Sequence, residues 1–322
     1  MSPRRLLVPA AALAVATLAL TGCSVGTGTA GDAADAAPGE TVTVKVGTLR
    51  GQPHFYAPFL YEDHAVDGVE FEVVTLDTTP ALSDALVAGT VDFAISGVTP
   101  TISSIAQDRD LKIVASAADG GAGFVGNDEV STPADLVGKT VGYIQGSAQE
   151  VAMRLTLEEA GVDPEDIDLV TVPVPEMAGQ FAAGDLDAFF GVEIGASIAL
   201  QNGGQEFADP YATPIGKVNI GLITTGELIE QDPDLVQKVV DTHVATTEWM
   251  TGNEDEWLTE MVDMFGGDQA IFDTAIENFW MRSDLSDEYL GQLEALAGEM
   301  AELGFIEDAP AIEDIADTSF VE

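Results

Sequence analysis

One phrase occurs twice in the chain, and it restricts the fold more than any other feature of the sequence. Residues 85–100 read ALVAGTVDFAISGVTP, and residues 179–195 read GQFAAGDLDAFFGVEIG. In each, a helical end of small residues meets a glycine, two further residues, an aspartate and an apolar run. Gly89 and Gly184 lie 95 residues apart, as do Asp92 and Asp187.

The same offset relates two further pairs of glycines. Gly47 and Gly51 in KVGTLRG correspond to Gly142 and Gly146 in TVGYIQG. We therefore predict two copies of one βαβ unit, at residues 42–115 and 136–203, in which helices join parallel strands. The repeated aspartates then lie where a helix turns into a buried strand, and we expect a structural role for them, with a ligand role as the alternative.

Apolar runs of strand length alternate with helical stretches from residue 41 onward. Strands are predicted at residues 41–49, 69–76, 91–97, 111–118, 139–145, 167–174, 186–192 and 217–225. Helices are predicted at residues 53–65, 79–89, 99–108, 147–161, 176–184 and 195–204, and the chain is expected to be helical from 226 to its end. Such alternation is typical of α/β proteins with mainly parallel sheets.

The N-terminus has the pattern of an export signal. Two arginines precede an almost wholly apolar run at residues 6–20, which is too short to cross a bilayer comfortably. The following LTGC resembles the bacterial lipobox, and its Cys23 is the only cysteine of the chain. We predict a lipoprotein signal peptide at residues 1–22 and lipidation of Cys23; a plain secretory signal is the alternative. The paired arginines leave the general and the twin-arginine export routes open.

Composition restricts the partners of the chain. The formal net charge is −45, from 56 acidic and 11 basic residues, so the surface repels nucleic acid. The acidic residues are spread along the chain, as a solvated surface requires. Residues 23–40 lack aromatic side chains and are predicted to form a flexible tether between the lipid and the folded part.

Three successive stretches carry a resemblance to a known family. They are ALVAGTVDFAISGVTPTISSIAQDRDLKIVASA (85–117), TPADLVGKTVGYIQGSAQEVAMRLTLEEAGV (132–162) and FAAGDLDAFFGVE (181–193). In this order they resemble the substrate-binding proteins of ABC importers for nitrate, aliphatic sulfonates, taurine and thiamine-pyrimidine precursors. The similarity extends over residues 42–260.

The resemblance implies an α/β fold of the periplasmic-binding-protein type II class. Two lobes, each a mainly parallel sheet flanked by helices, are joined by two crossover segments and close on a small solute. Residues 41–118 with 216–322 are expected to form lobe 1 with the C-terminal helices, and residues 119–215 lobe 2. The protein is then expected to be a monomer, anchored to the outer face of the cell membrane, that passes its solute to an ABC permease.

Enzyme signatures occur only as incomplete matches. GAGFVG at 121–126 fits G-x-G-x-x-G, but the following NDEVSTPADL cannot open the long helix that a dinucleotide requires, so we interpret it as a glycine-rich crossover. GKT at 138–140 lacks the rest of a phosphate loop. His54, His64 and His243 are too scattered for a metal site, and no nucleophile–base pair can be assembled. We expect no catalytic residue, no metal and no cofactor.

Candidate ligand contacts lie where predicted strands end, because open α/β sheets bind ligands beyond the carboxyl ends of their strands. In the first lobe these are Ser96, Gly97 and Thr99, with Ser116 on the following strand. Thr99 is predicted to be the N-cap of a helix whose first residue is Pro100. Capping alone is the alternative role.

The second lobe offers an equivalent position at Gly146 and Ser147. Ser147 is predicted to cap a helix, and Glu150 three residues later to complete a capping box. A glycine beside the cap lets a ligand approach the helix N–H groups. The 95-residue offset relates Ser147 to Gln52, so Gly51 and Gln52 are expected at the same place in the first lobe.

Three further side chains are candidates by their chemistry. Arg50 either clamps a sulfonate or carboxylate through two hydrogen bonds or pairs with a surface acid. Glu193 ends a predicted strand, and it either accepts from an ammonium or ring N–H or caps the next helix. Related proteins commonly carry an acid followed by proline here, whereas this chain has Ile194. His54, with the aromatic residues after it, is a candidate for an aromatic wall, and helix packing is the alternative.

These expectations combine into a lipid-anchored solute-binding protein. The family resemblance and Arg50 make a sulfonate the first choice of solute. Glu193 and the aromatic side chains make a pyrimidine or another heteroaromatic amine the alternative. A secreted enzyme of the same fold and a lipoprotein that binds another protein are the rival classes.

Overall fold

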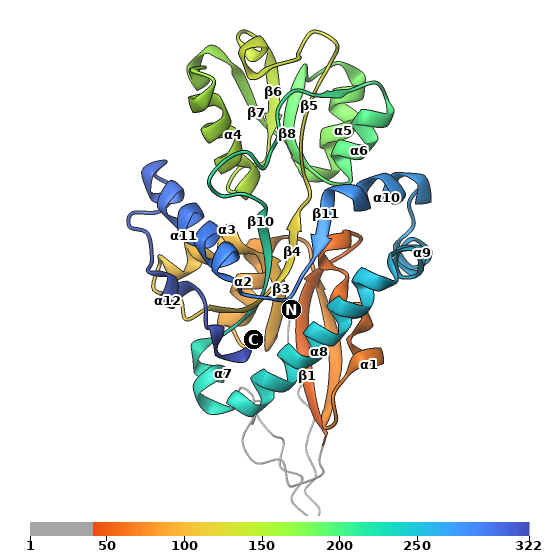
Figure 1. Cartoon of the computed structure of the whole chain (residues 1–322), viewed down its shortest axis with the longest axis vertical. Coiled ribbons are helices and arrows are strands. Elements are labelled where there is room, and N and C mark those ends of the chain that lie inside the picture. The colour runs from red at the N-terminus through yellow and green to blue at the C-terminus, as the bar shows by residue number, and fades with distance from the viewer. Residues whose placement is uncertain (1–40, 322) are drawn as a thin grey trace, which may run out of the picture. The chain divides into compact units, whose positions relative to one another are not determined.

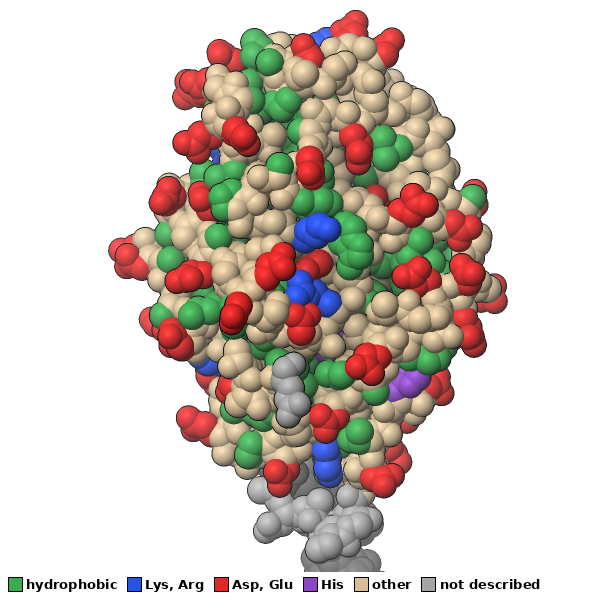
Figure 2. Space-filling view, viewed as in Figure 1, with side chains coloured by type: hydrophobic (Ala, Val, Ile, Leu, Met, Phe, Trp, Pro, Cys, Tyr) green, Lys and Arg blue, Asp and Glu red, His purple; other side chains and the backbone are tan. Residues whose placement is uncertain are grey.

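Two β-sheets organise residues 41–321, the part of the chain that the structure, a computed structural model, describes (Figure 1). The predicted signal peptide, the lipidation site at Cys23 and the predicted tether lie outside the described residues. No helix among residues 41–321 is long and apolar enough to cross a membrane. On the face shown in Figure 2, acidic side chains are scattered rather than gathered in one block.

The first sheet has six strands in the order β11-β4-β10-β3-β1-β2. They are β1 (Val42–Leu49), β2 (Val69–Leu76), β3 (Phe93–Gly97), β4 (Lys112–Gly120), β10 (Val218–Thr224) and β11 (Phe279–Met281). β1 is parallel to β2 and to β3, whereas β10 is antiparallel to β3 and β4, and β11 is antiparallel to β4. The short β11 corrects the prediction of an all-helical C-terminal part.

The second sheet has five strands in the order β7-β6-β8-β5-β9. They are β5 (Ala122–Gly126), β6 (Thr140–Tyr143), β7 (Asp168–Thr171), β8 (Ala188–Val192) and β9 (Gln205–Glu206). Here too a parallel trio, β7-β6-β8, is followed by an antiparallel strand, β5. The predicted pair of sheets is therefore confirmed, but each sheet is mixed, with a parallel trio beside antiparallel strands, rather than mainly parallel.

Helices flank both sheets, as the alternating pattern predicted. Those between strands are η1 (Pro53–Phe55), η2 (Ala57–Leu60), α1 (Tyr61–His64), α2 (Thr79–Val87), α3 (Val98–Ile105), η3 (Pro133–Leu136), α4 (Ala148–Glu159), η4 (Pro164–Asp166), α5 (Val174–Ala183) and α6 (Gly195–Gln201). After β10 follow α7 (Gly226–Gln231), α8 (Pro233–Gly252), α9 (Glu254–Phe265), α10 (Gln269–Ala275), η5 (Ile276–Asn278), α11 (Asp287–Glu302), α12 (Ile312–Ile315) and η6 (Thr318–Phe320). The helix predicted at residues 53–65 is instead three short pieces.

The C-terminal helices return to the first sheet. α8 packs on α1 and on β4, and α12 and η6 also contact β4 (Figure 1). Buried aliphatic and aromatic residues from both sheets form one large core, and a smaller core lies between the second sheet and α5 and α6. Burial of these side chains provides the main stabilisation of the described chain.

The junction between the sheets is unusually short. β4 ends at Gly120 and β5 begins at Ala122, so Gly121 alone separates strands of different sheets. Gly120 and Gly121 have left-handed φ angles of 76° and 72°, which glycine adopts without the penalty that other residues meet. This confirms a glycine crossover at Gly121, although the rest of GAGFVG is strand β5. The second connection, residues 207–217, returns from β9 to β10.

Strand register confirms the internal repeat. β1 pairs with β3 through Val46 and Phe93, and β6 pairs with β8 through Val141 and Ala188, each partner shifted by 95 residues. The pairs with the outer strands β2 and β7 differ from this offset by one residue. The strand register of the two units is thus identical for the central pairs β1–β3 and β6–β8 and shifted by one residue for the outer pairs.

The repeated glycines in β1 and β6 are required by close packing. A Cβ atom on Gly47 would come within 2.8 Å of the Leu82 side chain on α2. A Cβ atom on Gly142 would come within 2.8 Å of Met177 on α5, the residue equivalent to Leu82. In each unit the absence of a side chain lets the helix lie against the central strand.

The repeated aspartates bind the same backbone position in each unit. The Asp92 carboxylate accepts a hydrogen bond from Lys45 N at 2.7 Å, and Asp92 N donates to Lys45 O at 2.8 Å. The Asp187 carboxylate accepts from Thr140 N at 2.9 Å, and Asp187 N donates to Thr140 O at 2.8 Å. Lys45 and Thr140 are themselves 95 residues apart, so the structural interpretation of these aspartates is confirmed.

Asp92→Ala and Asp187→Ala should each lower the free energy of unfolding by about 1–3 kcal/mol, because each leaves a strand N–H without its acceptor. Urea denaturation followed by circular dichroism measures this loss. Asp185→Ala is the matched control, since Asp185 is exposed two residues from Asp187. Equal stability of all three variants would contradict the structural role of these aspartate–strand hydrogen bonds, which we call the aspartate clamps.

Candidate functional site

A cavity of about 560 Å³ is lined from both sheets. Its lining comes from loops and helix starts that follow strands, together with β10. The lining residues are Leu49, Gln52, His54, Phe55, Asp77, Thr78, Thr79, Pro80, Gly97, Thr99, Pro100, Ile144, Gln145, Gly146, Ser147, Ala148, Gln149, Pro173, Val174, Pro175, Val192, Glu193, Asn219 and Ile220. A cavity of this size suits a small organic molecule.

Four helices begin at this cavity. α2, α3, α4 and α5 follow β2, β3, β6 and β7, as expected for parallel units whose strands point at the ligand site. Their N-terminal N–H groups give this end of each helix a partial positive charge. Pro80, Pro100 and Pro175 lie in the first turns of three of them and lack an N–H, which lowers the number of available donors.

The predicted cap at Ser147 is confirmed. Its Oγ accepts from Glu150 N at 3.2 Å and donates to Ile144 O at 2.7 Å. The predicted capping box is altered, because the Glu150 carboxylate accepts from Gly146 N at 2.7 Å rather than from Ser147 N. Glu150 therefore places a carboxylate, paired with Arg154 at 2.8 Å, at the start of α4.

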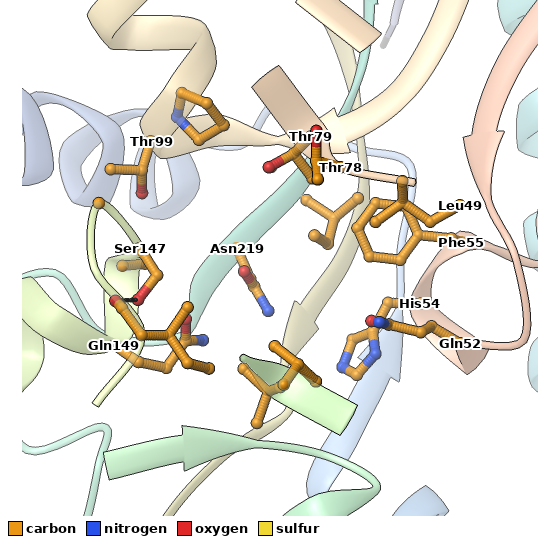
Figure 3. A pocket seen from close by; sticks show the side chains of 18 of the residues that line it. Leu49, Gln52, His54, Phe55, Thr78, Thr79, Thr99, Ser147, Gln149 and Asn219 are labelled. Atoms are coloured by element: carbon orange, nitrogen blue, oxygen red, sulfur yellow. Dashed lines mark hydrogen bonds between the residues drawn. The ribbon is translucent and has the colours of Figure 1, made fainter. Parts of the chain in front are cut away.

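The predicted cap at Thr99 is wrong. α3 begins at Val98, Gly97 is its N-cap, and no side chain accepts a hydrogen bond there. Thr99 lies within the first turn and lines the cavity. Figure 3 shows Thr99, Ser147 and Gln149 on one side of the cavity and His54 and Phe55 on the other.

Gln52 and His54 lie where the offset places the counterpart of Ser147. Both line the cavity. His54 is 3% exposed, and its ring lies 4.7 Å from the ring of Phe279. Its Nε2 has no hydrogen-bond partner among residues 41–321. Burial lowers the pKa of His54 to about 4, so the ring is neutral at pH 7.

Glu193 lines the cavity and also holds the start of α6. It is 2% exposed, its Oε2 accepts from Ser197 N at 3.1 Å, and its Oε1 accepts from Asn278 Nδ2 at 3.0 Å. Burial raises the pKa of Glu193, and the hydrogen bonds from Asn278 and Ser197 oppose this rise. The helix-capping role is present, and the remaining lone pairs of the carboxylate are available for a second role.

Four predicted contacts lie outside the cavity lining. Arg50 is exposed, and its guanidinium donates to Thr75 Oγ1 at 3.2 Å. Gly51 precedes the lining residue Gln52 but is not part of the lining. Ser116 Oγ donates to the Asp284 carbonyl at 2.5 Å.

Ser96 is the fourth of these residues. It is fully buried, and its Oγ has no partner among the described residues. Side chains alternate between the two faces of a strand, so lying near a strand end does not by itself direct a side chain into the cavity. The prediction that all the named residues line one cleft is corrected for Arg50, Gly51, Ser96 and Ser116.

Several lining residues were not predicted from the sequence, and of those labelled in Figure 3 Asn219 lies nearest the middle of the cavity. It lies on β10, and its Nδ2 donates to Gly120 O at 2.7 Å. An isolated asparagine in the strand VNIGLIT was the available signal. Gln149, Thr78 and Thr79 also line the cavity, and each lies at a helix start where no motif in the sequence marks it as a contact.

The charges around the cavity are acidic. Asp77 and Glu193 line it, and within the described part of the chain no lysine or arginine does. Leu49, Phe55 and Ile220 provide an apolar wall. The arrangement offers hydrogen-bond acceptors, helix N–H donors and an apolar wall.

Comparison with known proteins gives a consistent result. A profile of the family described as NMT1/THI5 like matches residues 61–257, more than half of the chain. A formylaminopyrimidine-binding protein from Halalkalibacterium halodurans is 26% identical over 264 residues, which cover 78% of this chain and 77% of that protein.

Solved structures are similar in fold. The periplasmic aliphatic sulphonate binding protein SsuA from Escherichia coli is similar with a TM-score of 0.73 and 17% identity, covering 85% of this chain and 97% of that one. The desulfurization enzyme DSZB is similar with a TM-score of 0.66 and 17% identity, covering 87% and 97%. The periplasmic-binding-protein type II fold is thus confirmed, and it occurs in binding proteins and in at least one enzyme.

The buried neutral His54 should make stability depend on pH. Because its pKa of about 4 lies below the value near 6.5 of an unfolded chain, the unfolded state binds the proton first as pH falls. The stability contributed by the neutral ring is complete above pH 6.5 and is lost between 6.5 and 4. When the pH falls from 7 to 4.5, the free energy of unfolding of the unsubstituted chain should decrease by roughly 2–3 kcal/mol more than that of the His54→Gln variant. Urea denaturation of both proteins at both pH values tests this. Equal decreases in their free energies of unfolding would contradict it.

Proposed function

Because the chain belongs to the NMT1/THI5-like family, we propose that it is the extracytoplasmic solute-binding protein of an ABC importer. The observation that carries this proposal is one cavity of about 560 Å³ lined from two sheets that are joined by a very short crossover. Related proteins that bind small solutes support it.

In this proposal, residues 41–118 with 216–322 form one lobe and residues 119–215 the other. A solute that contacts Thr99 and Asn219 on one lobe and Ser147 and Glu193 on the other favours the closed form, because only contacts made better in that form shift the equilibrium. The closed form is then presented to the permease.

The geometry favours a neutral or cationic nitrogen heterocycle as the solute. The buried carboxylate of Glu193 suits a ring N–H or amino donor, Phe55 and the apolar wall suit a flat ring, and Asn219 and Gln149 suit further polar groups. The name of the formylaminopyrimidine-binding relative agrees with this class. This reverses the order of the two sequence-based alternatives, since Arg50, the residue behind the sulfonate choice, lies outside the lining.

A sulfonate is the second candidate, and the four helix N-termini at the cavity favour it. Helix N–H groups bind anions without any basic side chain. Against it stand the two acidic lining residues and the three first-turn prolines. A catalytic role receives less support, because the cavity lacks a cysteine or a serine paired with a basic residue among the described residues.

Solute binding should be measurable directly. Calorimetric titration with a formylaminopyrimidine and cytosine, and with taurine and MOPS, should give binding for the pyrimidines. Glu193→Gln should weaken that binding about tenfold or more, because a charge-assisted hydrogen bond is lost. Arg50→Gln is the control and should bind like the unsubstituted chain.

Two outcomes would contradict the proposed solute class. If the chain binds the sulfonates and Glu193→Gln leaves their affinity unchanged or increases it, the sulfonate class is selected instead. A thermal unfolding temperature that none of the four compounds raises would remove both classes, because a bound solute at 100 times its Kd adds about 2.7 kcal/mol to stability.

The lipid anchor is the remaining part of the proposal, and it rests on the lipobox-like LTGC. Cys23→Ser should move the protein from the membrane fraction of its host to the soluble extracytoplasmic fraction, because the lipid-bearing thiol is lost. Immunoblots of fractionated cells measure the change. If the serine variant sediments with membranes as before, Cys23 is not the anchor.

A further inference from the structure

Asn278 lies just outside the cavity lining and bonds to segments that meet at the junction of the two sheets. It is the last residue of η5, directly before β11. Its Nδ2 donates to Ala122 O at 2.8 Å and to Glu193 Oε1 at 3.0 Å. Its main-chain carbonyl oxygen accepts a hydrogen bond from Gly121 N at 2.8 Å. One side chain and its backbone thus bind the first crossover and a cavity residue.

The second crossover binds the same residue. The Tyr211 hydroxyl donates to Asn278 Oδ1 at 2.8 Å and accepts from Ala122 N at 3.1 Å. Tyr211 belongs to the segment that returns from β9 to β10. Both connections between the sheets therefore converge on Asn278.

The position of the Glu193 carboxylate depends on this arrangement. Asn278 holds Oε1, the backbone N–H of Ser197 on α6 holds Oε2, and Glu193 N donates to Gly121 O at 2.8 Å. The donors come from opposite sides, one from the C-terminal part that packs on the first sheet and one from the second sheet's own helix. Rotation of the carboxylate is thereby restricted.

We propose that Asn278 is a positioning residue that orients the Glu193 carboxylate for a solute and fastens it to both crossover segments. The inference rests on the proposed function, because it assigns how the same cavity holds its solute. An amide suits this place since it donates to two acceptors while accepting from Tyr211. An aspartate would bring a second negative charge against Glu193, and an apolar residue would leave buried groups unpaired.

The charges near Glu193 make its titration a sensitive readout. Burial raises its pKa, the hydrogen bonds from Asn278 and Ser197 lower it, and the charge of Glu206 on β9 raises it. The Tyr211 phenol stays neutral, since burial raises its pKa far above physiological pH. His54, which lines the same cavity, is neutral above about pH 4. Glu206 and His54 are present in every variant, so a difference in the Glu193 titration midpoint between variants reports the loss of the Asn278 donor.

The first test needs no solute. In protein labelled with ¹³C at glutamate side-chain carboxyls, the Glu193 resonance is identified by its absence in Glu193→Gln. Asn278→Ala should raise the titration midpoint of Glu193 by about one pH unit, because a hydrogen bond to the charged form is lost. Asn278→Asp should raise it further. Tyr211→Phe is the matched control, since it loses the hydroxyl's hydrogen bonds to Asn278 Oδ1 and Ala122 N but keeps the Asn278 Nδ2–Glu193 bond, and the Glu193 midpoint should stay unchanged.

The second test uses calorimetric titration with a formylaminopyrimidine. Asn278→Ala should weaken binding about tenfold, and adding it to Glu193→Gln should cause no further loss, because both changes remove the same interaction. An unchanged Glu193 midpoint, an equal shift in Tyr211→Phe, or additive losses of affinity would overturn the inference. If the unsubstituted chain binds no pyrimidine, the proposed solute class fails, and the carboxyl titration still decides the role of Asn278.

Discussion

The rest of the structure depends on a two-glycine junction between the sheets. Gly120 and Gly121 both have left-handed φ angles, and neither has room for a side chain. A Cβ atom on Gly121 would lie 1.8 Å from His54 Nε2, and one on Gly120 would lie 2.8 Å from Asn278 O. Only glycine meets both conditions, and the short junction lets residues of both sheets line one cavity.

The duplication explains why the scaffold is symmetric and the cavity is not. The aspartate clamps and the central glycines match at the 95-residue offset because they serve packing within each unit. The residues at the cavity are not repeated at this offset: Gln52 is the equivalent of Ser147, and Val98 is the equivalent of Glu193. Among the described residues that line the cavity, Glu193 carries the one buried carboxylate, so a solute with donor groups on one side should bind in one orientation.

Much of the fold could be predicted from the sequence, because it depends on local signals. Glycine and aspartate spacing gave the repeat, apolar runs gave most strands, and Ser147 and Glu150 marked a real helix start. The three-residue β11 carries too short a pattern to be recognised, and Gly97 rather than Thr99 caps α3 because the helix begins at Val98, two residues before the predicted first residue Pro100. A cap prediction depends on which residue begins the helix.

The site was less predictable, because it depends on contacts between distant segments. Asn219 meets Gly120 across 99 residues, and Asn278 meets Glu193 across 85. The isolated asparagine in the strand VNIGLIT is the one local signal, and it does not indicate the distant partner of Asn219. Arg50 illustrates the reverse case: its chemistry suited an anion, but its side chain points to Thr75 at the surface. The type of a residue does not determine whether its side chain points into the cavity.

The central claim is that a solute held between the two lobes draws them together. Val87 and Val137 are 50% and 54% exposed, one on α2 and one next to η3, and the only cysteine of the chain is Cys23. Cysteines at both valines in the Cys23→Ser background therefore accept spin labels selectively, and electron–electron resonance measures the distance between them. The account predicts a shorter, narrower distance distribution when the pyrimidine is added. A distribution that is identical with and without a solute shown to bind would contradict it.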